Sequence, residues 1–282
     1  MKSDYNYSQL EVDLDKLGKL NFILDLKRQV VGAKFLYVKE EYDACSGKSV
    51  TNKNTFCRMV ALAMEGQNLK LTYDNFSCQG GPETLGLTPV SSYVKSGNQF
   101  STFKLYQDRA VAKKAQDSIS FLNQKIYGIQ LAPLTELRSP DVVMIICNAW
   151  QMMRLVQGYS YKYAMPRNIG MMGNQGVCSD LCARPFATND INVSALCLGA
   201  RMQTQADDGE LGVGMPLNIF VDTLDGVLKT FNPATEDRRK KIIQNHENGE
   251  EKLGFDIEFG KTYSSYAQEN PIPVERYKEE LF

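Results

Sequence analysis

The feature that most constrains the fold of this chain is an apolar run with a helix directly after it. Residues 141–148, DVVMIICN, are almost continuously apolar, which is the pattern of a strand buried on both faces. Residues 149–163, AWQMMRLVQGYSYKY, follow at once and read as a helix. Because strands and helices also interleave along the rest of the chain, the sequence predicts an α/β fold with one mixed sheet flanked by helices, and a mixed α+β arrangement is the alternative.

The remaining elements are predicted from periodicity and from capping and turn residues. Strands are expected over residues 29–38, 69–73, 168–172, 192–198 and 210–216. Helices are expected over 8–24, with Ser8 as the cap, from Asn54 or Thr55 to Gly66, over 108–127 and over 217–231. Residues 45–54 and 88–106 read as loops, and the Gly-Gly-Pro of residues 80–82 indicates that 77–87 is irregular.

The character of the chain changes at Pro233. The segment ATEDRRKKIIQNHENGEEK is charged and has only a thin apolar stripe. We therefore expect a single α/β domain over residues 1–232 and a polar C-terminal helical extension over 233–282.

Charge and hydropathy exclude several classes of partner. The 282 residues contain 32 Lys and Arg against 33 Asp and Glu, a net charge of −1, which gives no electrostatic footprint for nucleic acid or an anionic membrane. The N-terminal residues lack the apolar core of a signal peptide, and the longest apolar run, VVMII, is too short to span a bilayer. The sequence predicts a cytoplasmic protein and leaves homo-oligomerisation open.

Cysteine is abundant and histidine is nearly absent. The chain has seven cysteines, and in a cytoplasmic protein these are thiols, metal ligands or small buried hydrophobes more often than disulfides. The one histidine, His246, lies in a polar run, so a histidine-rich zinc or iron site is excluded. Any metal in this protein would be bound mainly through sulfur or oxygen.

The segment IGMMGNQGVCSDLCARPF, residues 169–186, contains the first candidate site. Glycines such as Gly173 and Gly176 allow tight turns or a close approach to a ligand. A helix is expected to start at Val177 or Cys178, where unpaired N–H groups attract an anion such as a thiolate. Cys178 is therefore a candidate nucleophile or metal ligand, with Cys182 one turn later. The alternative is that both cysteines are small residues buried under a turn.

The other cysteines give weaker indications. Cys78 precedes Gly80 and Gly81, which again allow close approach to a ligand, although a glycine turn with an incidental cysteine explains them equally well. Cysteines also occur in a predicted helix, Cys57, and near the carboxyl ends of predicted strands, Cys147 and Cys197. Sites in α/β folds gather at those strand ends, but a buried cysteine is more often a small hydrophobe.

Arginine and glycine patterns bear on whether the chain binds an anion or a nucleotide. Arg201 follows Gly199 just past a predicted strand, where a guanidinium can hold a carboxylate or phosphate, and the alternative is a surface arginine. The segment GELGVG lacks the G-x-G-x-x-G pattern, and no glycine loop is followed by a Walker lysine. The sequence therefore contains no nicotinamide or nucleotide motif.

Several segments, taken in order, resemble a known family. FCRMVALAMEG, SCQGGPETLGL, DVVMIICNAWQMMRLVQGYSY, GNQGVCSDLCARPF, NDINVSALCLGARM and DDGELGVGMPLNIF are similar to those of domain of unknown function 169, over about residues 20–231. That family occurs in archaea and bacteria, many of them anaerobes, and has no established activity. The resemblance ranks Cys78 and Cys178 first, because its pattern does not require Cys182 or Cys197, and it also includes Gly199 and Arg201.

Three hypotheses follow, and the sequence leaves open whether the protein is an enzyme. The first is a cysteine-lined site that binds an iron–sulfur cluster, or less readily zinc, for redox or lyase-type chemistry. The second is an enzyme with Cys178 as its nucleophile on a small anionic substrate. The third is a non-catalytic small-molecule binding or sensor module. Candidate metal ligands are Cys78 and Cys178, with Cys57, Cys147, Cys182 and Cys197 in reserve, and candidate substrate-binding or anion-binding residues are Arg201, Gly80, Gly81, Gly173 and Gly176.

Overall fold

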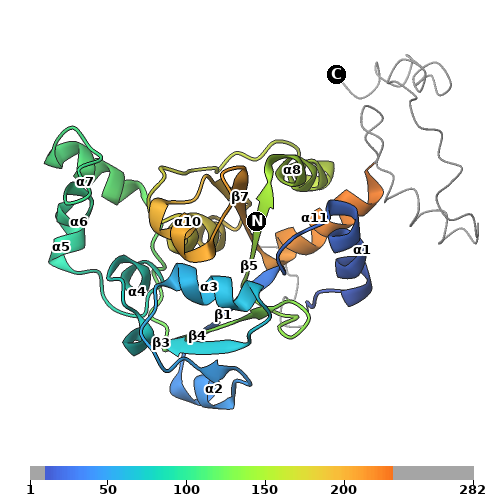
Figure 1. The fold of residues 1–282 in the computed structure, drawn as a ribbon, viewed down its shortest axis with the longest axis horizontal. Helices are drawn as coiled ribbons and strands as arrows, with labels where there is room; N and C mark the ends of the chain where they lie inside the picture. The colour runs from blue at the N-terminus through green and yellow to red at the C-terminus, as the bar shows by residue number, and fades with distance from the viewer. Residues whose placement is uncertain (1–9, 231–282) are drawn as a thin grey trace, which may run out of the picture.

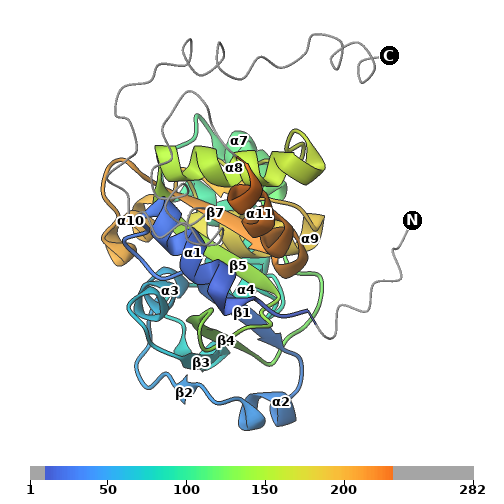
Figure 2. The same ribbon diagram turned by 90° about the vertical axis from the view of Figure 1, so that its right-hand side faces the viewer.

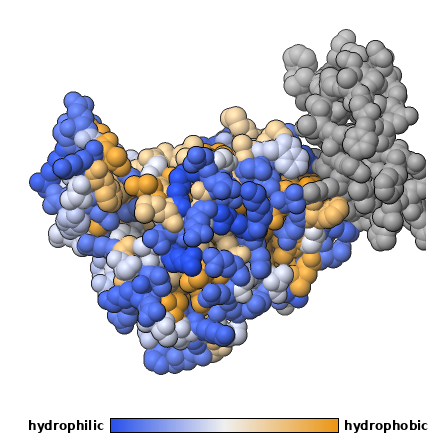
Figure 3. Space-filling model, viewed as in Figure 1, coloured by the Kyte–Doolittle hydropathy of each residue, from blue (hydrophilic) through white to orange (hydrophobic). Residues whose placement is uncertain are grey.

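The computed structural model describes residues 10–230, and Figure 1 shows their arrangement. The predicted cap Ser8, the predicted extension over 233–282 and His246 lie outside this range. On the face drawn in Figure 3 hydrophilic residues predominate, and hydrophobic ones are scattered among them.

One seven-stranded mixed sheet runs through the described residues, in the order β2-β3-β4-β1-β5-β7-β6. Only β2 and β3 pair in parallel, and the other neighbours are antiparallel. The predicted mixed sheet flanked by helices is confirmed, in its α+β form. The strands are β1 Val31–Leu36, β2 Lys48–Ser49, β3 Leu69–Thr72, β4 Gly128–Pro133, β5 Val142–Asn148, β6 Asn192–Ser194 and β7 Glu210–Pro216.

Side chains of β5 alternate between two separate cores, as a strand buried on both faces requires. On one face, Val142, Met144 and Ile146 pack in a core that also contains residues of α3, α10 and the π-helix η3. We call this side the cysteine face. On the other, Val143, Ile145 and Cys147 pack with residues of α1, α8 and α11, which lie together in Figure 2. We call this side the helical face.

The helices of the helical face are long and regular. They are α1 Leu14–Leu24, α8 Ala149–Tyr163 and α11 Leu217–Lys229. The N-cap Asn148 and the N3 residue Gln151 form a reciprocal capping box at the start of α8, which confirms the predicted junction with β5. The helix α1 starts later than predicted, because Asp13 is its N-cap and accepts hydrogen bonds from the N–H groups of Asp15 and Lys16.

Shorter helices surround the cysteine face and the remaining edges. They are α2 Lys39–Ala44, α3 Phe56–Met64, α4 Gly80–Thr84, α5 Ser92–Lys95, α6 Asn98–Ser101, α7 Arg109–Ser118, α9 Arg184–Thr188, α10 Leu198–Thr204, the 3-10 turn η2 Tyr73–Asn75 and the π-helix η3 Gly176–Ala183. Thr55 caps α3 by accepting from the N–H of Arg58, as the sequence predicted.

Three predictions around residues 77–127 are wrong, and one of them is the loop expected over 88–106, which contains α5 and α6. Gly80, Gly81 and Pro82 begin the helix α4, because proline is tolerated in a first turn, where its missing N–H has no intrahelical partner to lose. The helix predicted over 108–127 ends at Ser118. Beyond it the chain runs along the end of α4, where the N–H of Leu122 donates to the carbonyl of Thr84 at 2.9 Å, and then enters β4.

Residues 168–172 and 192–198 also differ from prediction. No strand forms over 168–172, because the backbone of Gly170 pairs with the side chain of Asn192 through two hydrogen bonds. The strand β6 stops at Ser194, whose hydroxyl accepts from the N–H of Leu196 at 3.0 Å. Leu196 then takes a left-handed conformation, with φ of 63°, and Cys197 caps α10.

Candidate functional site

Four cysteines from four separate segments meet on the cysteine face. Cys57 lies in the first turn of α3, Cys78 just before α4, Cys178 in η3 and Cys197 at the N-cap of α10. The thiol of Cys57 hydrogen-bonds to Cys197, and both Cys78 and Cys178 act on its pKa through space. Cys178 is in turn affected by Cys78 and Cys197. The helices that carry them pack together, α3 against both α10 and η3, and α4 against η3 (Figure 1).

Cys197 is the anionic centre of this group. Its Sγ interacts with the thiol of Cys57 and with the N–H groups of Gly176, Ala200 and Cys197 itself, which together outweigh burial and lower its pKa to about 6. The Ala200 N–H to Sγ distance is 3.3 Å. The N-cap position and a neighbouring thiol therefore favour the Cys197 thiolate.

Gly176 brings the start of η3 against Cys197. A Cβ at this position would lie 2.7 Å from the Cys197 nitrogen and 2.9 Å from the Leu196 Cα, so only glycine allows the approach. The sequence predicted that N–H groups at the start of this helix attract a thiolate. They do, but the thiolate belongs to Cys197, a residue from a distant segment.

Cys178 does not ionise easily, contrary to the prediction. Its side chain is buried, and burial raises its pKa, as do the nearby Cys78, Cys197 and Asp180. The N–H of Ser179 opposes this increase only in part. The prediction assumed an open helix start, whereas η3 begins inside the core with every residue buried. The thiol of Cys57 also has a raised pKa, first because it donates to Cys197 and then because it is buried.

Cys147 and Cys182 lie apart from the four converging cysteines. Cys147 points into the helical face, on the opposite side of β5, and burial raises its pKa to about 12. Cys182 is fully buried in the core of the cysteine face, where burial and Asp141 raise its pKa, and none of the other cysteines contributes to that shift. The two residues therefore fit the alternative of small buried hydrophobes.

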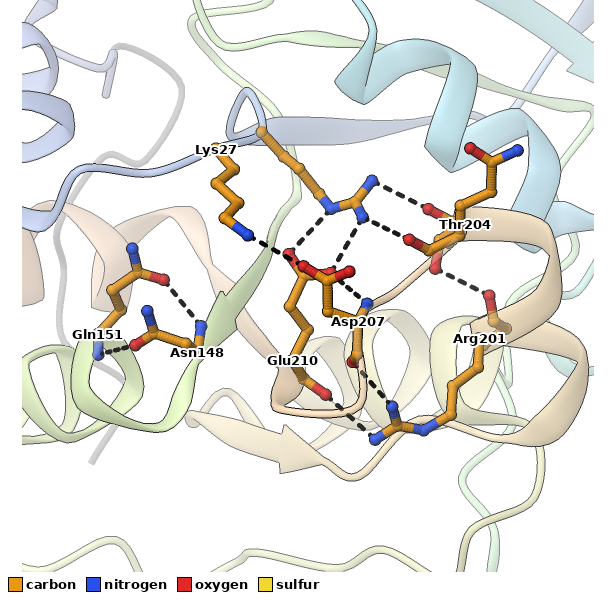
Figure 4. A network of polar contacts seen from close by, with 10 residues as sticks. Lys27, Asn148, Gln151, Arg201, Thr204, Asp207 and Glu210 are labelled. Carbon is orange, nitrogen blue, oxygen red and sulfur yellow. Dashed lines mark hydrogen bonds and ion pairs between the residues drawn. The ribbon is translucent and has the colours of Figure 1, made fainter.

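Arg201 holds the chain around α10. Its guanidinium donates to the main-chain carbonyls of Ala195, Asp207 and Glu210, at 2.9, 3.1 and 3.1 Å (Figure 4). Most of its hydrogen-bonding capacity is therefore used within the protein. The signal that would have found this role is the turn that follows α10, whose carbonyls need donors.

The predicted glycines have different surroundings. Gly80 faces the side-chain amides of Gln99 and Gln175, each 2.6 Å from the position of an added Cβ, so the two glycine segments meet at α4. An added Cβ on Gly81 would lie 3.0 Å from the Cys78 Sγ. Gly173 has a φ of 74°, and a Cβ added to it would have no other atom within 4 Å. Gly80, Gly81 and Gly176 thus shape the cysteine site, and Gly173 supplies a turn.

The four thiols are spread rather than tightly clustered. Within residues 10–230, no three His, Cys, Asp or Glu side chains are grouped closely enough to hold one metal ion. Cys57 interacts most strongly with Cys197, and Cys78 and Cys178 act on it only through space.

Comparison with known proteins identifies relatives without an assigned activity. The family model DUF169, described as "Uncharacterised ArCR", matches residues 19–226. The uncharacterized protein MJ0308 of Methanocaldococcus jannaschii is 26% identical over 219 residues, which cover 74% of this chain and 91% of that protein. No solved structure matches the chain.

The match to the family model spans all four converging cysteines. In the part of the chain that the structure describes, none of the helices has the length and apolarity to cross a membrane. Since the family model covers well over half of the sequence, the chain belongs to the DUF169 family.

Proposed function

We propose that Cys57, Cys78, Cys178 and Cys197 hold an iron–sulfur cluster. The observation that carries this proposal is the meeting of four thiols from four distant segments in one core. Four cysteines used only as small hydrophobes have no reason to gather at one point, whereas thiolate ligation of a cluster requires it.

The described residues contain no group of three ligand side chains that could hold one metal ion, which disfavours a single zinc ion. Each thiolate of a four-iron cluster binds a different iron atom, so a cluster does not require its four sulfurs to be as close together as the ligands of one ion.

The surroundings also suit a thiolate-bound cluster. The N–H groups of Gly176 and Ala200 point to the Cys197 sulfur, and that of Ser179 to the Cys178 sulfur. Hydrogen bonds of this kind stabilise thiolate charge and tune reduction potential. A bound cluster would supply electron transfer or a Lewis-acidic iron, and this chain would supply the thiolates and the apolar enclosure.

We assign this chemistry to the cytoplasm, because all seven cysteines carry free thiols, the state that a reducing compartment maintains.

Anaerobic isolation tests this proposal. The protein should be brown, contain iron and acid-labile sulfide, and absorb near roughly 400 nm through thiolate-to-iron charge transfer. A colourless protein without iron after anaerobic reconstitution with iron and sulfide would rule the proposal out. Zinc bound to the same four cysteines would replace the cluster with a structural ion.

A second function, cysteine-based nucleophilic or redox catalysis, is favoured by the Cys197–Cys57 contact. With its pKa at about 6, Cys197 is mostly thiolate at neutral pH, and Cys57 is a protonated thiol beside it. The nucleophile of this version is Cys197, in place of Cys178. In metal-free protein, alkylation of Cys197 should follow a titration with a midpoint near 6. A midpoint near the ordinary thiol value of 9.0 would remove this candidate.

A further inference from the structure

A pocket of about 430 Å³ opens beside Cys78. This volume lies in the range of sites that enclose small ligands. The lining residues come from three segments, the loop before α3, the chain from η2 to α4 and the loop before α5, and include Lys53, Cys78 and Glu83. Residues of three separate segments thus form this pocket on the cysteine face.

A buried carboxylate holds part of the pocket wall. Glu83 is 4% exposed and accepts hydrogen bonds from Gln79 Nε2 at 3.1 Å, the Ser91 N–H at 3.0 Å and the Ser91 hydroxyl at 3.2 Å. Three donors within the protein therefore satisfy both carboxylate oxygens. Glu83 fixes the loop before α5, and Phe76, Pro82 and Pro89 add apolar surface.

The charge of the pocket sets the class of molecule that fits it. Lys53 is the one cationic side chain among the described residues that line the pocket, and it is exposed at the rim. Ser77 and Thr88 add neutral hydroxyls to the lining. Glu83 also lines the pocket, but its two oxygens accept hydrogen bonds from Gln79 and Ser91. The ammonium of Lys53 is therefore the group offered to a single negative charge, such as one carboxylate.

Cys78 belongs both to this pocket and to the group of four cysteines. It lines the pocket, and it acts electrostatically on Cys57 and Cys178. We propose that the pocket binds a small monocarboxylate, paired with Lys53, and places the rest of that molecule at Cys78. The role of the pocket as the substrate site of the cysteine centre rests on the proposed function. The binding of a monocarboxylate in the pocket does not.

Two alkylating agents of similar size test the inference, since iodoacetate carries a carboxylate and iodoacetamide does not. In either case the Cys78 sulfur forms a bond to the CH₂ carbon, and iodide leaves. The full chain is purified in air, reduced and freed of metal, and labelling of each cysteine is followed by peptide mass spectrometry. Lys53 should raise the iodoacetate-to-iodoacetamide rate ratio at Cys78.

Charge removal provides the decisive variant. Lys53→Gln should lower the ratio at Cys78 roughly two- to fivefold, the range that an exposed ion pair supplies. Lys48→Gln, an exposed lysine that lines a different pocket, should leave the ratio unchanged. An unchanged ratio in Lys53→Gln, or labelling of Cys78 as slow as that of the buried Cys147, would overturn the inference.

The same labelling separates failure of the pocket from failure of the cluster. In protein that carries iron, Cys78 should be protected from both reagents. If iron is bound and Cys78 still reacts at its metal-free rate, Cys78 is not a ligand, and the proposed four-cysteine centre is wrong. The effect of Lys53 in metal-free protein does not depend on that result.

Discussion

The two faces of the central sheet share the same strands but are covered by different kinds of helix. The helical face packs three long helices, α1, α8 and α11, over alternating residues of β5. The cysteine face uses short helices, the π-helix η3 and left-handed residues such as Gln175 and Leu196. Irregular backbone of this kind is common at functional sites, where N–H groups are aimed at a ligand or a sulfur. One face contributes regular packing, and the other is the face to which the proposed function assigns the chemistry.

The largest expected effect is on the helical face, where α8 and α11 touch at two glycines. A Cβ on Gly226 would lie 2.0 Å from the carbonyl oxygen of Gly158, a backbone atom that cannot move alone. Gly226→Ala should therefore lower the free energy of unfolding by about 3 kcal/mol, measured by urea denaturation. Gly18→Ala is the control, because no atom lies within 4 Å of its added Cβ, and it should stabilise α1 by up to about 1 kcal/mol. Equal effects of the two variants would contradict the packing described.

A smaller loss is expected from removing the ion pair that joins Arg28, after α1, to Glu210 at the start of β7. Arg28 donates to both carboxylate oxygens of Glu210, at 3.2 and 3.0 Å, and to the carbonyls of Thr204 and Gln205. Arg28→Ala should cost about 2 kcal/mol in the free energy of unfolding, since it leaves the buried Glu210 without its partner. The neighbouring pair Lys27–Asp207 is exposed on both sides, so Lys27→Ala should cost almost nothing (Figure 4).

This ion pair also predicts a pH dependence. Burial alone would raise the pKa of Glu210, but the hydrogen bonds from Arg28 and from the Asp207 N–H lower it below the ordinary 4.5. The stabilisation is therefore fully present above pH 4.5 and is lost as the pH falls through the lowered pKa. Unfolding curves from pH 7 to pH 3 should show this loss in the wild type, and a smaller one in Arg28→Ala. Identical pH profiles would exclude the pair as its cause.

The last expected effect is on the chemistry of Cys197, although Gly176→Ala should also cost stability, because its Cβ would meet backbone atoms of Leu196 and Cys197 at 3.0 Å or less. Its Cβ would separate the start of η3 from Cys197 and remove an N–H that stabilises the thiolate. The pKa of Cys197, about 6 in the wild type, should rise towards the ordinary 9.0, as measured by the pH dependence of alkylation. Gly199→Ala, in α10 with no neighbour within 4 Å, should keep the wild-type value. An unchanged pKa of Cys197 in Gly176→Ala would show that the Gly176 N–H does not lower it.

Local signals predicted the regular parts of the molecule well. The junction of β5 with α8 and the Thr55 cap of α3 follow from periodicity and capping residues. The strand β4 was not predicted, and the helix expected over 108–127 ends at Ser118, beyond which Leu122 and Ile126 bond to the carbonyls of Thr84 and Gly86. Those bonds are tertiary, and local propensity does not contain them.

The candidate site was predicted in part. The sequence predicted that N–H groups at the start of the Cys178 helix attract the thiolate of Cys178, whereas in the structure the Gly176 N–H acts on Cys197, from a segment about twenty residues later. The face of Cys147 was predictable, because it follows Ile145 by two positions, and both point away from Met144 and Ile146. The convergence of Cys57 with Cys197 depends on α3 packing against α10, and no local pattern reveals that.

The most direct test of the central claim compares iron bound by cysteine variants of the two faces. Cys197→Ser and Cys57→Ser, on the cysteine face, should lose the iron and sulfide that the wild-type chain carries after anaerobic reconstitution. Cys147→Ser, on the helical face, should retain wild-type iron per folded chain. Equal iron content in all three variants, or none in the wild type, would contradict the assignment of the cysteine face as a cluster site.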